Sequence, residues 1–139
     1  FAGAALRRLG ARGLLTLGLA AEGLRWLLTA LSPDLAVVRA AQLLHGVGVA
    51  GVLVGGPLYL ELSVPSRLRA TGQALVATIG IGLASMLSIS AAGALFDSMG
   101  PKFPYLLSGI GASLLALAVR WRLPQPYRPE ARASDILQS

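Results

Sequence analysis

Residues 13–31 read GLLTLGLAAEGLRWLLTAL, and residues 35–60 read LAVVRAAQLLHGVGVAGVLVGGPLYL. As an α-helix, each stretch is about as long as the 20 or so apolar residues needed to cross a hydrocarbon layer of about 30 Å. Two more apolar stretches follow, residues 70–96 and 103–121. Of the 139 residues, 55% are hydrophobic and 13% are charged, and the mean hydropathy is +0.69. The sequence therefore predicts an all-α membrane protein with four transmembrane helices.

The basic residues outside these spans or at their ends lie almost entirely on one side of the predicted membrane. That side carries Arg7, Arg8, Arg12, Arg67, Arg69, Arg120, Arg122, Arg128 and Arg132. The other side carries only Lys102. Short cytoplasmic loops are enriched in Lys and Arg, so both termini and the central loop are expected in the cytoplasm, with the spans in the cell (plasma or inner) membrane. The net charge of +6 then reflects topology, and no nucleic-acid partner is expected.

The predicted domain organisation has three parts. Residues 1–12 form a cytoplasmic basic loop, residues 13–121 carry the four spans, and residues 122–139 form a cytoplasmic tail expected to be disordered. A short pattern occurs twice in the chain, in Leu9–Arg12 ahead of the first span and in Met99–Lys102 ahead of the fourth. In each segment a glycine stands two residues before a basic residue, and we call this repeated pattern the internal echo. Inverted repeats of three spans occur in transporters. If the echo is such a repeat, the chain is a fragment that lacks earlier helices.

Polar and ionisable side chains inside the first two spans form the candidate functional site. They are Glu22 and Arg25 in the first span, and Arg39, Gln42 and His45 in the second. Counting 1.5 Å per residue from the outer ends places Glu22 and His45 at a common depth near the middle of the membrane. Intramembrane ionisable groups commonly mark substrate and proton pathways, and histidine titrates near neutral pH. The alternative is structural: Glu22 and Arg25 neutralise each other and hold two helices together.

Other motifs favour packing over chemistry. Gly51 and Gly55 form a GxxxG pattern, which is typical of close helix packing in membranes, and Gln73 is predicted to donate a hydrogen bond between helices. The sequence lacks cysteine and the motifs HExxH, GxxxxGK[ST] and GxSxG. We therefore expect no enzyme activity, no catalytic residues, no cofactor and no metal site.

Two segments resemble the C-terminal half of major facilitator superfamily symporters. They are Gln42–Gly46 (QLLHG) and Pro65–Leu75 (PSRLRATGQAL). The similarity is greatest to the branch with lactose, phenylpropionate and nucleoside permeases, and Leu9–Arg12 is similar to that family's loop between helices eight and nine. The resemblance implies that the four spans are helices nine to twelve of a twelve-helix fold. It also implies a small-molecule solute, protons, the lipid bilayer and the missing N-terminal helices as partners.

The resemblance also assigns roles to single residues. In lactose-permease-like members an arginine on helix nine and a histidine on helix ten line the proton and sugar cavity, and Arg25 and His45 match them. Those members carry a glutamate one turn after the histidine, where this chain has Gly48, and no aspartate follows Gly10 as in the family's loop motif. Either Glu22 substitutes for the missing glutamate, or coupling rests on residues outside this chain.

Three functional hypotheses follow from the sequence. The first is alternating-access transport of a small solute, as proton-coupled symport, by a protein of which this chain is a C-terminal fragment. The second is a complete four-helix protein that acts as a dimeric exporter with Glu22 as its membrane carboxylate. The third is a non-transporting membrane scaffold whose polar groups only join helices.

Overall fold

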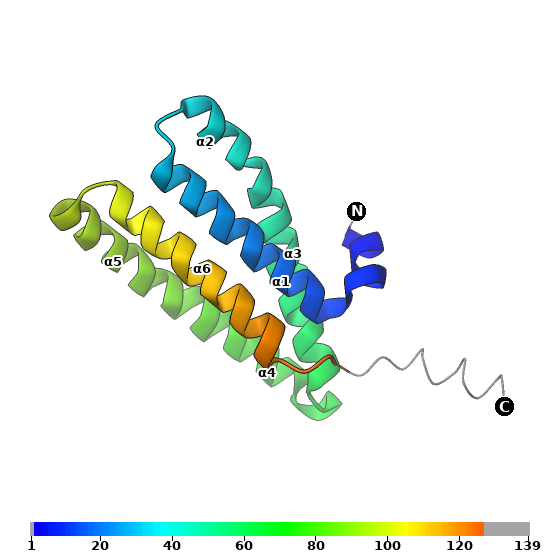
Figure 1. The fold of residues 1–139 in the computed structure, drawn as a ribbon. Helices are drawn as coiled ribbons and strands as arrows, with labels where there is room; N and C mark the ends of the chain where they lie inside the picture. Colours follow the sequence, from blue (N-terminus) through cyan, green and yellow to red (C-terminus); the bar gives the residue numbers. More distant parts are fainter. Residues whose placement is uncertain (1, 127–139) are drawn as a thin grey trace.

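The computed structural model describes residues 2–126, and every element in this part of the chain is a helix (Figure 1). In order, the elements are α1 (Ala2–Leu31), α2 (Leu35–Ala41), α3 (Leu43–Ser63), η1 (Ser66–Leu68), α4 (Arg69–Leu75), η2 (Val76–Leu83), α5 (Ala84–Met99) and α6 (Lys102–Arg122). They make up four helices that are long and apolar enough to cross a membrane: Arg8–Leu31, Leu35–Ser63, Ser66–Met99 and Lys102–Arg122. The predicted all-α fold with four such helices is confirmed. Of the tail expected to be disordered, residues 127–139 lie outside the described part.

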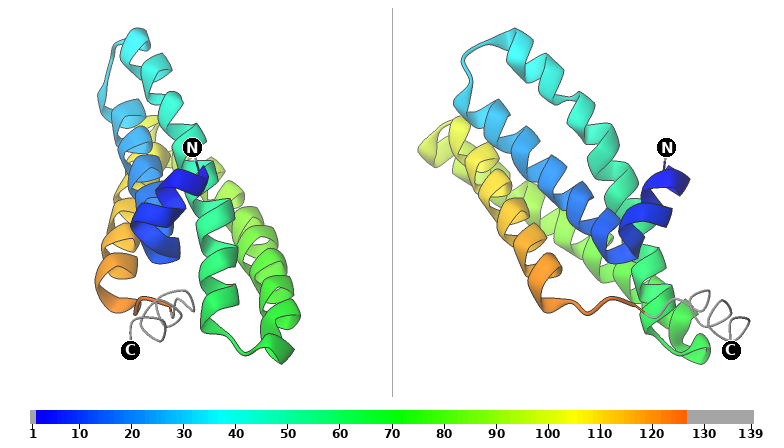
Figure 2. Two further views of the ribbon diagram at one scale, coloured as in Figure 1. Left: turned by 90° about the vertical axis from the view of Figure 1, so that its right-hand side faces the viewer. Right: turned by 45° about the vertical axis from the view of Figure 1, so that its right-hand side comes forward.

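Helix α1 lies at the centre of the packing, with α3 on one side and α6 on the other (Figures 1 and 2). The span made of α4, η2 and α5 contacts the other helices much less, and its residues from Ala74 to Ala91 are all exposed. Part of this span is π-helical, in η2, which the sequence pattern did not predict. Residues 74–91 therefore form a surface that is largely uncovered within the described part of the chain.

Glycines let α1 and α3 approach at backbone distance. A Cβ atom built on Gly51 would lie 2.7 Å from the nitrogen of Gly18, and one on Gly55 would lie 2.7 Å from the nitrogen of Leu15. Both separations are too short for a real side chain, so only glycine permits this contact. The GxxxG pattern of Gly51 and Gly55 is thus confirmed as a packing motif.

The two glycines of the internal echo share one unusual backbone conformation. Gly10 has φ 70° and ψ 175°, and Gly100 has φ 88° and ψ 172°. A positive φ is strained for residues with a Cβ atom, and these are the two glycines with positive φ among the described residues. The first kinks α1, so that residues 2–9 form a separate helical segment in place of the expected loop. The second separates α5 from α6, so both echo sites redirect the chain into a membrane helix.

A hydrogen bond from the Gln73 side chain joins α4 to α3. Its Nε2 donates a hydrogen bond of 3.0 Å to the carbonyl oxygen of Pro57, which lies inside α3. This bond confirms the predicted role of Gln73 as an interhelical donor. It fixes the otherwise sparsely packed third span to the second span.

Candidate functional site

Glu22 and Arg25 lie one turn apart on α1 and form a short ion pair. Arg25 donates from Nε and Nη2 to the same carboxylate oxygen, Oε2 of Glu22, at 2.9 and 2.7 Å. The spacing of three residues brings both side chains to one side of the helix. The Arg25 side chain is 8% exposed and that of Glu22 is 17% exposed, so the pair is largely enclosed by protein.

The second carboxylate oxygen of Glu22 contacts α3. Oε1 of Glu22 lies 2.8 Å from Nδ1 of His45. A carboxylate paired with a guanidinium is an acceptor only, so Nδ1 carries the hydrogen of this bond. The two side chains that the sequence places at a common depth are thus in direct contact. Glu22 thus connects Arg25 and His45, with one oxygen for each partner.

Gln42 completes the cluster at a break in the second span. A turn at Gln42 separates α2 from α3. Two backbone hydrogen bonds here join residues three apart: Gln42 N–H donates to the carbonyl of Arg39, and His45 N–H donates to the carbonyl of Gln42. The Gln42 side chain accepts from Nη1 of Arg25 at 3.3 Å and donates to the carbonyl of Val38 at 3.2 Å. A short 3₁₀-type segment inside a helix commonly accompanies functional sites.

Gly48 provides the space that the Glu22 side chain fills. A Cβ atom at Gly48 would clash with the Oε1, Cγ and Cδ atoms of Glu22, and Gly48 itself is buried. The resemblance placed a glutamate of related symporters at this position. In this chain the Glu22 side chain lies directly against residue 48, which has no side chain.

An aromatic pair supports the guanidinium from the side of α6. The guanidinium carbon of Arg25 lies 3.8 Å from the ring centre of Trp26. The Trp26 ring in turn stacks on Tyr105 of α6, with ring centres 5.4 Å apart and an angle of 11° between the planes. Such cation–π contacts are stabilising and become stronger when water is excluded. Through this stack the cluster, whose residues lie on α1 and on the second span, is also connected to α6.

The four residues of this cluster, Glu22, Arg25, Gln42 and His45, differ strongly in exposure. Arg25 is buried, whereas the His45 side chain is 56% exposed and Gln42 is also exposed. The cluster is closed at Arg25 and open at His45. With a neutral imidazole, the charges of Glu22 and Arg25 cancel.

The structure does not bring Arg39 into the cluster. Its side chain is exposed on α2, and no hydrogen bond or ion pair joins it to another side chain among the described residues. The sequence pattern groups it with Gln42 and His45 because all three are polar or ionisable residues inside the second span.

Two supports of the site were not recognised from the sequence. Gly48 was noted only as the absence of a glutamate, and Trp26 was not among the predicted site residues. That Gly48 faces the Glu22 side chain could have been found only by knowing how the two helices are aligned. For Trp26 the signal was its position directly after Arg25.

Comparison with known proteins identifies the family and several distant relatives. The MFS_1 like family model matches residues 1–107. The magnetosome protein MamZ of Paramagnetospirillum magneticum is 30% identical over 108 residues, which cover 78% of this chain and 17% of MamZ. The chloroplastic D-xylose-proton symporter-like 3 of Arabidopsis thaliana is 31% identical over 105 residues, which cover 70% of this chain and 19% of the relative.

MamZ of Magnetospirillum gryphiswaldense is 30% identical over 108 residues, or 78% of this chain and 16% of that protein. The chain thus spans less than a fifth of the length of each of these relatives. No solved structure matches the chain.

Proposed function

The chain belongs to the MFS_1 like family and is an integral multi-pass membrane protein, and from this premise we propose that it is part of a proton-coupled solute transporter. The proposed protein moves a small solute by alternating access. Its four helices here would be helices nine to twelve of a twelve-helix fold, with the arginine-rich ends in the cytoplasm and the spans in the cell membrane. Family membership points to transport and not to an enzyme.

The observation that carries the proposal is the position of Glu22 between Arg25 and His45. Glu22 fills the space opposite Gly48, and we assign it the role of the glutamate that this position lacks. Transporters commonly couple protons through carboxylates and histidines inside the membrane. The Arabidopsis relative, named as proton symporter-like, supports the same reaction class.

In the proposed mechanism the proton binds at the exposed side of His45. Nδ1 of His45 donates to Glu22, so Nε2 is the ring atom that accepts a proton. Protonation converts a cluster with no net charge into one with a charge of +1. Charge inside the membrane is costly unless water or a counter-charge is near. Protonation therefore changes the relative free energies of the open and closed cavity, which is what coupling requires.

The decisive experiment is transport by the full-length protein in proteoliposomes under an imposed pH gradient. D-xylose is the first solute to test, in a panel of labelled sugars. Glu22→Gln keeps the size of the side chain but removes its charge. We expect this variant to lose gradient-driven accumulation and to retain solute exchange without a gradient.

Gln73→Ala is the matched control, because it removes another intramembrane hydrogen bond far from the cluster. It should lower stability by about 0.6 kcal/mol, the average for a hydrogen bond between membrane helices, and leave the pH dependence of uptake unchanged. If both variants change the pH dependence equally, the cluster only packs helices. If Glu22→Gln still accumulates solute, the charge of Glu22 beside His45 is not required for coupling.

A further inference from the structure

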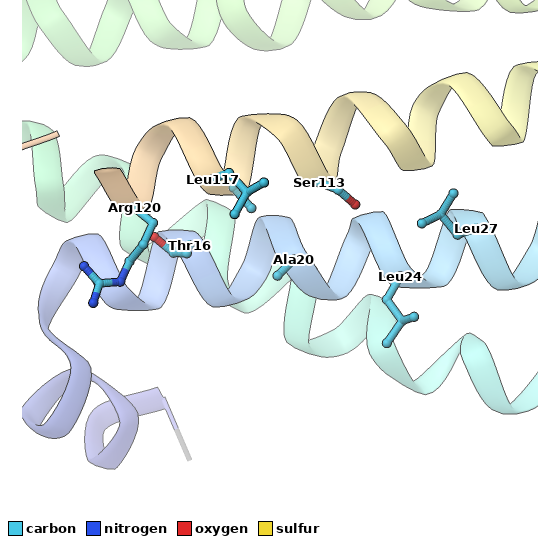
Figure 3. Close-up of a pocket in the computed structure, with 8 residues that line it drawn as sticks. Thr16, Ala20, Leu24, Leu27, Ser113, Leu117 and Arg120 are labelled. Carbon is cyan, nitrogen blue, oxygen red and sulfur yellow. The ribbon is translucent and has the colours of Figure 1, made fainter. Parts of the chain in front are cut away.

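A groove of about 360 Å³ lies between α1 and α6, away from the polar cluster (Figure 3). Its walls are mainly apolar and come from Ala20, Leu24, Leu27, Ala116 and Leu117. Spacings of three and four residues place the contributing residues of each helix on one face. The groove is open to the surroundings of the bundle, since Leu24 and Leu117 are 49% and 46% exposed.

The hydroxyl groups in the groove are already used within their own helices. Thr16 Oγ1 donates to the carbonyl of Arg12 at 2.9 Å, and Ser113 Oγ donates to the carbonyl of Gly109 at 2.8 Å. Neither hydroxyl hydrogen is free for a ligand. The walls therefore offer little to a sugar or another polar solute, but they suit a hydrocarbon chain.

The groove is about as long as one leaflet of a bilayer is thick. From Thr16 to Leu27 the α1 wall is about 16 Å long at 1.5 Å per residue, which is about half of a hydrocarbon core of about 30 Å. Arg120 lines the groove at the end near Thr16 (Figure 3). Helix α6 ends two residues later, at Arg122. Arg120 is thus placed where the headgroup of a lipid lies if its acyl chain occupies the groove.

Arg120 is exposed and has no carboxylate partner among the described side chains. Among the described side chains, carboxylates form ion pairs with Arg25 and Arg69, and none lies within ion-pair distance of Arg120. A protein helix without a carboxylate at this level would cover a guanidinium that has no counter-charge among the described residues, which is unfavourable. A phosphate headgroup supplies the charge and also keeps the guanidinium at the membrane surface.

We propose that this groove binds one anionic phospholipid from the leaflet at the arginine-rich end of the bundle. One acyl chain lies along Leu24, Ala20 and Leu117, and the phosphate pairs with Arg120. This site is independent of proton coupling at Glu22. Binding at this site makes the protein sensitive to the lipid composition of the membrane.

The test is photo-crosslinking of the full-length protein with benzoylphenylalanine in place of Leu24. The protein is placed in vesicles with equal amounts of phosphatidylglycerol and phosphatidylcholine, and the lipid adducts are counted by mass spectrometry. We expect at least about fivefold more phosphatidylglycerol adduct, because one basic residue near a membrane surface contributes about 1 kcal/mol and 1.4 kcal/mol is a factor of ten. A probe at Leu114, which is exposed on α6 outside the groove, should give nearly equal adducts.

Arg120→Gln should bring the adduct ratio at Leu24 close to one. Arg122→Gln is the matched control, since this exposed arginine lies in the same helical turn but does not line the groove; it should leave the ratio within about twofold. Equal adducts at Leu24 in the unmodified background overturn the proposal. So does a crosslink from Leu24 to another segment of the same protein in place of lipid, or an equal effect of the two arginine substitutions.

Discussion

Gly51→Ala tests whether the close approach of α1 and α3 builds the polar cluster. A Cβ atom at Gly51 would lie 2.7 Å from Gly18 N and 2.8 Å from the carbonyl oxygen of Leu14, and ordinary contacts begin at 3.4 Å. The obstructing atoms are backbone, so they cannot rotate away. The helices must separate locally by at least about 0.7 Å, the difference between 3.4 and 2.7 Å, to reach van der Waals contact.

This separation acts on the site as well as on stability. The contact between His45 and Glu22 is 2.8 Å long and crosses the same helix interface. Lengthening it by about 0.7 Å gives about 3.5 Å, which no longer makes a good hydrogen bond. Overpacking of a close contact costs about 1–3 kcal/mol, so Gly51→Ala should both destabilise the protein and weaken the proton dependence of uptake.

Gly46→Ala is the matched control in the same helix. Nothing lies within 4 Å of a Cβ atom built there. Both substitutions gain the same helix propensity, about 1 kcal/mol, so their difference isolates the steric effect. We expect Gly46→Ala to unfold at a higher temperature than Gly51→Ala, with a difference of about 1–3 kcal/mol in the free energy of unfolding. Equal unfolding temperatures in detergent and equal uptake would refute the reasoning.

Three further substitutions test the turn at Gly100, the aromatic support and the end of α6. Gly100→Ala should cost about 1–3 kcal/mol, because its φ of 88° and ψ of 172° lie in a region open almost only to glycine. Gly93→Ala, at an unobstructed position in α5, should not destabilise, and thermal unfolding of both variants measures the difference. Trp26→Leu removes the ring beside the Arg25 guanidinium. It should reduce proton-driven solute uptake more than solute exchange without a gradient, whereas a loss of folded protein would reduce both equally. Arg12→Gln removes the 2.8 Å bond to the carbonyl of residue 123. It should speed amide hydrogen exchange at Leu123 and Gln125 in mass spectrometry, since residues 124 and 126 are prolines without an amide hydrogen, and leave the rates elsewhere unchanged.

The sequence by itself determined the helices and the chemistry of the site. Four apolar stretches, divided by Pro33, by Pro65 and by Gly100-Pro101, were sufficient because a chain in hydrocarbon must satisfy its backbone hydrogen bonds within helices. The spacing of Glu22 and Arg25 was enough to predict their pairing, since neighbours on one helix face depend only on local geometry.

Only the tertiary structure decided which helices meet and what completes the cluster. The contact of Gly18 with Gly51, the space that Gly48 leaves for Glu22 and the stack of Trp26 on Tyr105 all depend on the alignment of two helices distant in sequence. In a membrane the lipid is as apolar as the helix surfaces, so hydrophobicity does not select the partner faces. Close packing and interhelical hydrogen bonds select them, and both require atomic positions that periodicity does not contain.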